Sequence, residues 1–253
     1  MTESADAPKT LYHYTTQSGL KGIVEKREVW ATDIAYLNDS AEYRYAMNLL
    51  KAAVPQGGLD MELLPDLRKI LERFESSNDE FPGVFVFSMS TDEDGLDLWR
   101  GYGGGDSGYA LGLAKNELAN LASTKKFQLV RCKYETAEHD QLIRQFIDEL
   151  RVFCKKNGFT KEKAPLAEQR YQFNMYFFNA WGLVAARLKN PKFRNELEWR
   201  LVSQFHNFAE SPKIECRTGR STLIPYVKLT IAGVPFHRLT VGPTIDPVRA
   251  RTR

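Results

Sequence analysis

The chain of 253 residues is 43% hydrophobic and 12% aromatic, which is enough apolar material for one sizeable core or two small ones. Its formal net charge of +3 is too small to indicate a nucleic-acid-binding protein by itself. The three cysteines, Cys132, Cys154 and Cys216, are widely spaced and form no CxxC pair, which argues against a zinc ribbon or a disulfide framework and favours a reducing cytoplasm.

The first 90 residues are predicted to begin with a disordered polar tail over 1–9, which has no apolar segment typical of a signal peptide. Period-two and helical patterns then predict strands over 10–15, 29–35 and 83–90 and a helix over 18–28. Two more helices are predicted, one opened by the capping residues Asn38-Asp39-Ser40 and one over 59–76 with Pro65 as a kink or restart.

The remaining residues are predicted to form a short helix over 92–100, a glycine-rich loop over 101–108, and strands over 109–113, 127–134, 196–205, 222–231 and 238–241. Long helices are predicted over 137–156 and 164–188; the apolar stretch 173–186 is too short to span a bilayer, so no membrane association is expected. Strands at both ends with helices between them indicate one α+β domain over 10–247, with a helical insertion around 136–190 and a basic tail over 248–253.

Three polar clusters lie far apart on the chain, each inside a hydrophobic run: His13-Tyr14-Thr15, Ser88-Met89-Ser90 and Glu196-Leu197-Glu198. A polar group on a core strand must be hydrogen-bonded or functional, because burying it unpaired costs roughly 1–3 kcal/mol. Only the fold can bring these clusters together, so we expect their strands to lie close and to open on a common groove.

The third cluster belongs to an alternating segment in which Glu196, Glu198 and Arg200 share one strand face. Two carboxylates at this spacing can act on one ligand, and a carboxylate stabilises the oxocarbenium-like centre that forms when a nicotinamide–ribose bond breaks. The alternative is a solvated strand face that carries a Glu–Arg pair.

Each of the other two clusters also has a structural alternative. His13 can hydrogen-bond a ribose hydroxyl from either ring nitrogen, or it is a satisfied structural histidine. Ser88 and Ser90 share a strand face and can orient a ligand or a carboxylate, or they bond the local backbone at a strand end.

The glycine-rich loop contains Gly103-Gly104-Gly105-Asp106-Ser107-Gly108, a match to GxGxxG, but it precedes a strand instead of opening a helix. We therefore interpret it as a mobile loop that orders over a bound nucleotide. Trp99 and Tyr102 beside it are candidates for stacking on nicotinamide or adenine, with core packing as the alternative. The absence of GxxxxGK[ST], HExxH and GxSxG argues against kinase-like, zincin and serine-hydrolase classes.

Seven short motifs are distributed along the chain: Tyr12-His13-Tyr14-Thr15, Leu37-Asn38-Asp39-Ser40-Ala41-Glu42, Phe87-Ser88-Met89-Ser90, Leu98-Trp99-Arg100-Gly101-Tyr102, Glu196-Leu197-Glu198-Trp199-Arg200, Pro225-Tyr226 and Gly242-Pro243. Taken together, these motifs resemble a bacterial family known as domain of unknown function 2971, and the resemblance covers most of residues 11–245. This family implies no established activity.

A more distant resemblance is to ADP-ribosyltransferases of the His–Tyr–Glu and Arg–Ser–Glu kinds, and it implies a split β-sheet core with NAD⁺ as substrate. By this resemblance His13 holds the adenosine ribose, Tyr14 and Thr15 lie at nicotinamide, and Ser88 and Ser90 form the serine motif. Glu198 is then the catalytic acid, and Glu196 is the upstream carboxylate that engages the acceptor, a protein or a nucleic acid. The same resemblance suggests a toxin or a phage-defence effector.

The sequence therefore predicts an NAD⁺-consuming, ADP-ribosyltransferase-like enzyme that needs no metal. One alternative is a non-catalytic module that binds a nucleotide or nucleic acid. Another is a metal-dependent hydrolase in which Asp39, Glu42 and Glu198 converge on a divalent cation. The oligomeric state is left open by the sequence.

Overall fold

The structure is a computed structural model that describes residues 8–37, 41–55, 65–76, 83–104, 108–159, 166–206, 213–219 and 222–244. Residues 1–7 and 245–253, which carry most of the two predicted tails, lie outside the described residues, as do Asn38, Asp39 and Ser40. The centre of the glycine-rich loop, residues 105–107, lies outside them as well, so the mobility of this loop stays a prediction.

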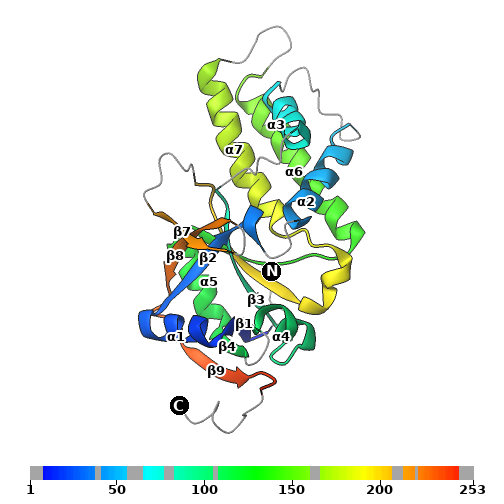
Figure 1. Cartoon of the computed structure of the whole chain (residues 1–253). Coiled ribbons are helices and arrows are strands. Elements are labelled where there is room, and N and C mark those ends of the chain that lie inside the picture. The colour runs from blue at the N-terminus through cyan, green and yellow to red at the C-terminus, as the bar shows by residue number, and fades with distance from the viewer. Residues whose placement is uncertain are drawn as a thin grey trace.

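One sheet of nine strands forms the centre of the molecule (Figure 1). The strands are β1 (Thr10–Thr16), β2 (Glu28–Asp33), β3 (Phe85–Ser90), β4 (Gly108–Ala114), β5 (Phe127–Arg131), β6 (Glu198–Ser203), β7 (Ile214–Thr218), β8 (Leu223–Thr230) and β9 (Phe236–Val241). Their order is β7-β8-β2-β3-β1-β4-β9, and β6 pairs with both β3 and β5. All of these strand pairs are antiparallel, and together with the helices they give an α+β architecture.

The sheet divides at β3. One edge of β3 pairs with β6 along most of its length. The other edge pairs with β2 at Val86, opposite Thr32, and with β1 at Ser90, opposite Tyr12. Two strands thus leave the same edge of β3, and between them residues 87–89 have no strand partner on that side within the described part of the chain.

Helices cover both faces of the sheet (Figure 1). They are α1 (Gln17–Lys26), α2 (Ala41–Ala53), α3 (Pro65–Ser76), α4 (Leu96–Tyr102), α5 (Lys115–Thr124), α6 (Thr136–Lys156) and α7 (Ala167–Ala185), with 3₁₀ turns at Ile34–Tyr36 and Pro191–Glu196. The larger core joins α2, α3, α6 and α7 to the sheet face that carries Val86 and Val202. The second core joins α1 and α5 to the opposite face, which carries Phe87 and Leu201. No helix in the described ranges is long and apolar enough to cross a membrane.

The helices α6 and α7 are inserted between β5 and β6, two strands that pair directly with each other. This agrees with the helical insertion predicted around 136–190. The helix predicted over 59–76 begins at Pro65 in the structure, as a restart would, and residues 59–64 lie outside the described part.

Several predicted boundaries are wrong, among them the start of the helix predicted over 92–100, which begins at Leu96, and the end of the strand predicted over 127–134, which ends at Arg131. The strand predicted over 29–35 ends at Asp33, whose carboxylate accepts a hydrogen bond from the Ala35 backbone and starts a 3₁₀ turn. The strand predicted over 196–205 begins only at Glu198, because residues 191–196 form a 3₁₀ turn that ends with Leu197 in the left-handed region at φ 44°. The helix predicted to reach Leu188 ends at Ala185. Helix α5 and strand β7 have no counterpart among the predicted elements.

Candidate functional site

A cavity of about 790 Å³ lies beside the division in the sheet. Its lining includes members of all three polar clusters and several other predicted residues: His13, Tyr14, Thr15, Glu42, Ser88, Ser90, Tyr102, Glu196, Glu198 and Arg200. The expectation that the three clusters meet at one groove is therefore met.

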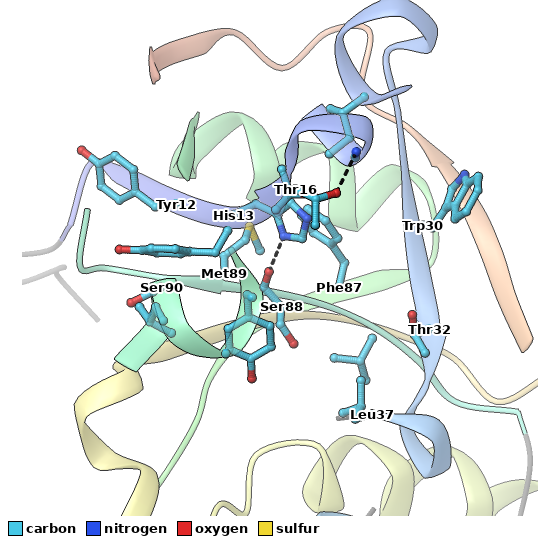
Figure 2. Close-up of a pocket in the computed structure, with 18 of the residues that line it drawn as sticks. Tyr12, His13, Thr16, Trp30, Thr32, Leu37, Phe87, Ser88, Met89 and Ser90 are labelled. Carbon is cyan, nitrogen blue, oxygen red and sulfur yellow. Dashed lines mark hydrogen bonds between the residues drawn. The ribbon is translucent and has the colours of Figure 1, made fainter. Parts of the chain in front are cut away.

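His13, on β1, lies in the middle of the cavity lining and bridges the gap along the edge of β3 (Figure 2). Its Nδ1 lies 2.9 Å from the backbone oxygen of Ser88, and its ring packs against Phe87 with 4.4 Å between centroids. Because a carbonyl oxygen only accepts, Nδ1 must carry the hydrogen. Burial lowers the pKa of His13. The ring is thus held neutral, with Nε2 left as an acceptor for a hydroxyl group of a ligand.

Two tyrosines contribute neutral phenol groups to the lining. The Tyr14 hydroxyl donates to the Asp92 carbonyl at 2.9 Å and accepts from the Gly95 backbone at 2.9 Å, and burial raises the pKa of Tyr14 to about 12. Burial also raises the pKa of Tyr102, and the nearby negative charge of Glu196 adds to this effect. Tyr14 fixes the turn before α4, whereas Tyr102 lies close enough to the carboxylates to respond to their charge.

The two serines of β3 differ in what their hydroxyl groups do. Ser90 is buried, and its hydroxyl donates to the Glu196 carbonyl at 2.6 Å and accepts from the Asp92 backbone at 3.0 Å. The bond from Asp92 is the local backbone bonding that was the structural alternative for this residue, whereas the bond to Glu196 joins β3 to a segment 106 residues further along the chain. Ser88 contributes its backbone oxygen to His13, and it is among the residues that line the cavity.

Glu198 and Arg200 form a buried ion pair on one face of β6. Arg200 Nε donates to Glu198 Oε1 at 2.7 Å and Nη2 donates to Oε2 at 2.9 Å. Arg200 also donates from Nη2 to Glu42 at 2.6 Å and from Nη1 to the Ala186 carbonyl at 3.0 Å. The predicted sharing of one face is confirmed for this pair, but the solvated Glu–Arg alternative is wrong, because both side chains are buried.

Lys189, in the segment after α7, completes the cluster. Its ammonium group pairs with Glu42 at 3.1 Å, with Glu198 at 2.5 Å and with Glu196, while only 1% of its side chain is exposed. Glu196 reaches this ammonium from the 3₁₀ turn and not from the strand itself. We refer to Glu42, Lys189, Glu196, Glu198 and Arg200 as the carboxylate cluster.

Three carboxylates and two cations leave the carboxylate cluster with one excess negative charge when all five are ionised. Burial favours the protonated form of Glu198, but Arg200 and Lys189 outweigh it and hold the pKa of Glu198 at about 2. Burial raises the pKa of Glu196, with Lys189 acting against that rise. Glu198 is therefore the fixed anion of the cluster, and Glu196 is the carboxylate whose charge responds to its surroundings.

Several predicted residues take other places. Trp99 does not line the cavity; it is buried, donates from Nε1 to Asp94 at 2.8 Å and packs edge-on against Tyr14, so the core-packing alternative describes it. Asn38 and Asp39 lie outside the described residues, so the hydrolase alternative is tested only at Glu42 and Glu198, which face Lys189 and Arg200. Among the described residues no group of three or more His, Cys, Asp or Glu side chains is placed to hold a metal ion.

Sequence reasoning missed Lys189, whose position after an aromatic helix carries no recognisable signal. It also missed a second wall of the cavity formed by Trp30 and Thr32 of β2 and by Arg217 of β7. The alternation of Glu28, Trp30 and Thr32 with apolar residues did carry a signal, because it marks one polar face on a strand whose other face is buried.

Together the fold and the site define an α+β protein with a divided antiparallel sheet and a polar cavity that holds a buried carboxylate cluster. Residues 98–201 match the family described as "Protein of unknown function (DUF2971)", and the chain is similar to this family over that segment, as its motifs indicated. The motifs on β1, β3 and β8 lie outside the matched segment. Comparisons with curated proteins and with solved structures found no match.

Proposed function

We propose that this protein is an ADP-ribosyltransferase-like enzyme that cleaves the bond between nicotinamide and ribose in NAD⁺. The observation that carries the proposal is the meeting of the histidine, serine and glutamate clusters in one cavity beside a divided sheet. The order of these clusters along the chain, and a sheet that divides between the first two of them, are features that the resemblance to ADP-ribosyltransferases implies.

The proposed chemistry breaks the N-glycosidic bond, and its electron pair leaves with nicotinamide, which becomes neutral. The ribosyl carbon is left as an oxocarbenium-like cation, which water or an acceptor then attacks with loss of a proton. The excess negative charge of the carboxylate cluster stabilises this cation in a buried site, where electrostatic effects are strong.

Glu198 remains the main proposed electrostatic stabiliser, because its low pKa keeps it ionised at neutral pH. Its two oxygens already accept bonds from Arg200 and Lys189, so it acts through its charge more than through a direct bond to the substrate. Glu196 bonds Lys189 through Oε2 only, and among the described residues Oε1 has no donor. Glu196 is therefore placed to bond a ribose hydroxyl or an acceptor.

His13 is proposed to accept a hydrogen bond from a hydroxyl of the adenosine ribose through Nε2. Its Nδ1 is used by the Ser88 carbonyl, and its lowered pKa keeps Nε2 unprotonated at neutral pH. Because this contact is remote from the bond that breaks, His13→Ala is expected to weaken NAD⁺ binding more than it lowers the rate at saturation.

The test is release of nicotinamide from NAD⁺, followed by chromatography, with water alone and with cell lysate as a source of acceptors. Glu198→Gln keeps the shape of the side chain and removes its charge, so turnover is expected to fall about 10²-fold or more. Glu196→Gln is expected to impair transfer more than hydrolysis. Glu138→Gln is the matched control, because this glutamate forms a partly exposed pair with Lys133 away from the cavity.

Nicotinamide release that does not exceed a no-enzyme blank, or a Glu198→Gln variant as active as Glu138→Gln, would show the proposed mechanism to be wrong. The acceptor class, protein or nucleic acid, and a role as a toxin or in phage defence stay predictions that rest on resemblance.

One observation favours a second candidate, a nucleotide-binding module without catalysis. Both oxygens of Glu198 are occupied by cations of the same chain, as they are in a purely structural ion cluster. Such a module would bind NAD⁺ stably in calorimetry and leave it intact during long incubation, which separates it from the enzyme.

A further inference from the structure

The carboxylate cluster occupies one part of the cavity, and a different set of side chains lines another part. On β2, Glu28, Trp30 and Thr32 alternate along the strand, and all three line the cavity. Figure 2 shows Trp30 and Thr32 well separated from Tyr12 and Ser90, on the far side of His13. We call this second part of the lining, together with Lys26 and Arg217, the β2 wall.

Trp30 is an aromatic side chain with a free surface. Its indole ring stacks on the phenol ring of Tyr226, with 4.4 Å between centroids and 24° between planes, while 41% of the residue remains exposed. Tyr226 is held in turn by its hydroxyl group, which donates to Glu215 at 2.9 Å. Because Tyr226 covers one face of the indole and fixes its orientation, the rest of the ring is available as a platform for a planar ligand group.

In the part of the chain that the structure describes, the two cations of the β2 wall take part in no ion pair. Arg217 Nη2 donates to the Thr32 hydroxyl at 3.1 Å, and within the described ranges no carboxylate forms an ion pair with Arg217 or with Lys26. The nearby Glu215 is already paired with Lys228 at 2.6 Å.

Glu28 is the acid that the β2 wall contributes to the cavity lining, against the two cations Lys26 and Arg217. The β2 wall thus carries a net positive charge, whereas the carboxylate cluster carries a net negative one. The cavity is therefore charged oppositely in its two parts. NAD⁺ has the matching asymmetry, because its nicotinamide ring is cationic and its pyrophosphate is anionic.

We infer that the β2 wall is the subsite for the adenine nucleotide half of the substrate, an inference that rests on the proposed function. The adenine base stacks on the free surface of Trp30, and a phosphate lies against Arg217 and Lys26. The nicotinamide ribose then points toward the carboxylate cluster, with His13 between the two parts. This arrangement fixes the direction in which the dinucleotide lies in the cavity.

The experiment measures binding and not catalysis, with ADP, adenosine and a single-stranded oligonucleotide as separate probes. Trp30 is the most exposed of the four tryptophans, so ADP is expected to quench the intrinsic fluorescence of the wild-type protein. Equilibrium dialysis then compares Trp30→Ala, Trp30→Phe and Arg217→Gln with Tyr171→Ala, which removes an aromatic residue that is 53% exposed on α7 and does not line the cavity.

We expect Trp30→Ala to weaken ADP binding about tenfold or more, the usual order for losing a stack between a base and an aromatic ring, and Trp30→Phe to weaken it less. Arg217→Gln should weaken ADP binding and leave adenosine binding unchanged, because adenosine has no phosphate. Circular dichroism and thermal unfolding identify any variant that has lost its fold. If Trp30→Ala is one of these, Trp30→Phe still tests the inference, because it keeps an aromatic ring stacked on Tyr226.

The inference is wrong if Trp30→Ala binds ADP as tightly as Tyr171→Ala, or if only the oligonucleotide binds to the β2 wall. The proposed function is tested separately. If the protein releases nicotinamide and Trp30→Ala binds ADP as tightly as wild type, the proposed function is supported and the β2 wall is not the adenine subsite. If ADP binding depends on Trp30 but no nicotinamide is released, the subsite is supported and the proposed enzymatic function is wrong.

Discussion

Lys189→Met is the substitution for which the structure gives the largest expected loss of stability. The Lys189 side chain is 1% exposed, and its ammonium group is the cation shared by Glu42, Glu196 and Glu198. Methionine fills a similar volume without charge, so the change leaves the buried Glu42 and Glu198 and the partly buried Glu196 with Arg200 as their one cation within the cluster. Removing one partner of a buried ion pair costs about 3–5 kcal/mol, because it leaves uncompensated charge in a medium of low dielectric.

For a chain of this length each kcal/mol corresponds to about 2–4 °C in Tm, so we expect Tm to fall by about 6–20 °C. Differential scanning calorimetry and urea unfolding at neutral pH measure the loss. The matched control is Lys21→Met, because Lys21 pairs with Glu25 on the surface of α1 with side-chain exposures of 70% and 56%. The control should shift Tm by no more than about 2 °C.

The loss in Lys189→Met should also depend on pH and on Glu196. Without the ammonium group, burial and like charge raise the pKa values of the carboxylates in the folded protein. The loss is then largest at neutral pH and becomes smaller as pH falls and the carboxylates take up protons. Lys189→Met combined with Glu196→Gln should recover part of the stability. A Tm equal to that of Lys21→Met, or a loss that is independent of pH, would refute the reasoning.

Three further predictions concern titration, thiol chemistry and backbone conformation. Burial lowers the pKa of His13 in the folded protein, so the stability that this histidine contributes is complete above its unfolded pKa of about 6.5 and is lost as pH falls below it. Between pH of about 7.5 and 5.5, urea unfolding should therefore show that His13→Asn loses less stability than wild type, by at most about 1.4 kcal/mol per pH unit. With a thiol-specific chromogenic reagent, the exposed Cys216 should react first and the buried Cys132, whose pKa is raised by burial, only on unfolding; equal rates would contradict this difference in burial. Gly83→Ala should destabilise the protein, because Gly83 has φ +116° and a Cβ there would lie 2.1 Å from a backbone oxygen, whereas Gly22→Ala in α1 meets no atom within 4 Å and should stabilise it by about 0.5–1 kcal/mol, as thermal unfolding of both variants would show.

The pattern of residues along the chain was sufficient for most strands and helices. The run before Ser90 predicts a buried strand, and β3 is bounded by paired strands on both edges over part of its length. The alternation in β6 correctly placed Glu198 and Arg200 on one face, because side chains in any strand alternate regardless of what surrounds it. Helix α5 was missed because Leu118 and Ala122 are its only buried apolar residues, so its apolar pattern is weak.

Boundaries were less predictable, because they depend on single side chains that bond the backbone. Asp33 ends β2 by accepting from the Ala35 backbone, and Asn190 accepts from the Lys192 backbone to start the turn that keeps Glu196 out of β6. The same residue types occur inside strands and loops elsewhere, so composition alone does not say which of them will act in this way.

The sequence alone was sufficient for the class of the fold, for the resemblance to a family, and for the three polar clusters that needed an explanation. Only the tertiary structure decided that these clusters share a cavity, that Lys189 and Glu42 join Glu198, and that Trp30 and Arg217 form a second wall. The physical reason is that local periodicity follows from backbone geometry within a few residues. The charge balance of a buried site, in contrast, depends on contacts between segments more than a hundred residues apart, as between Glu42 and Arg200, and no local pattern encodes that distance.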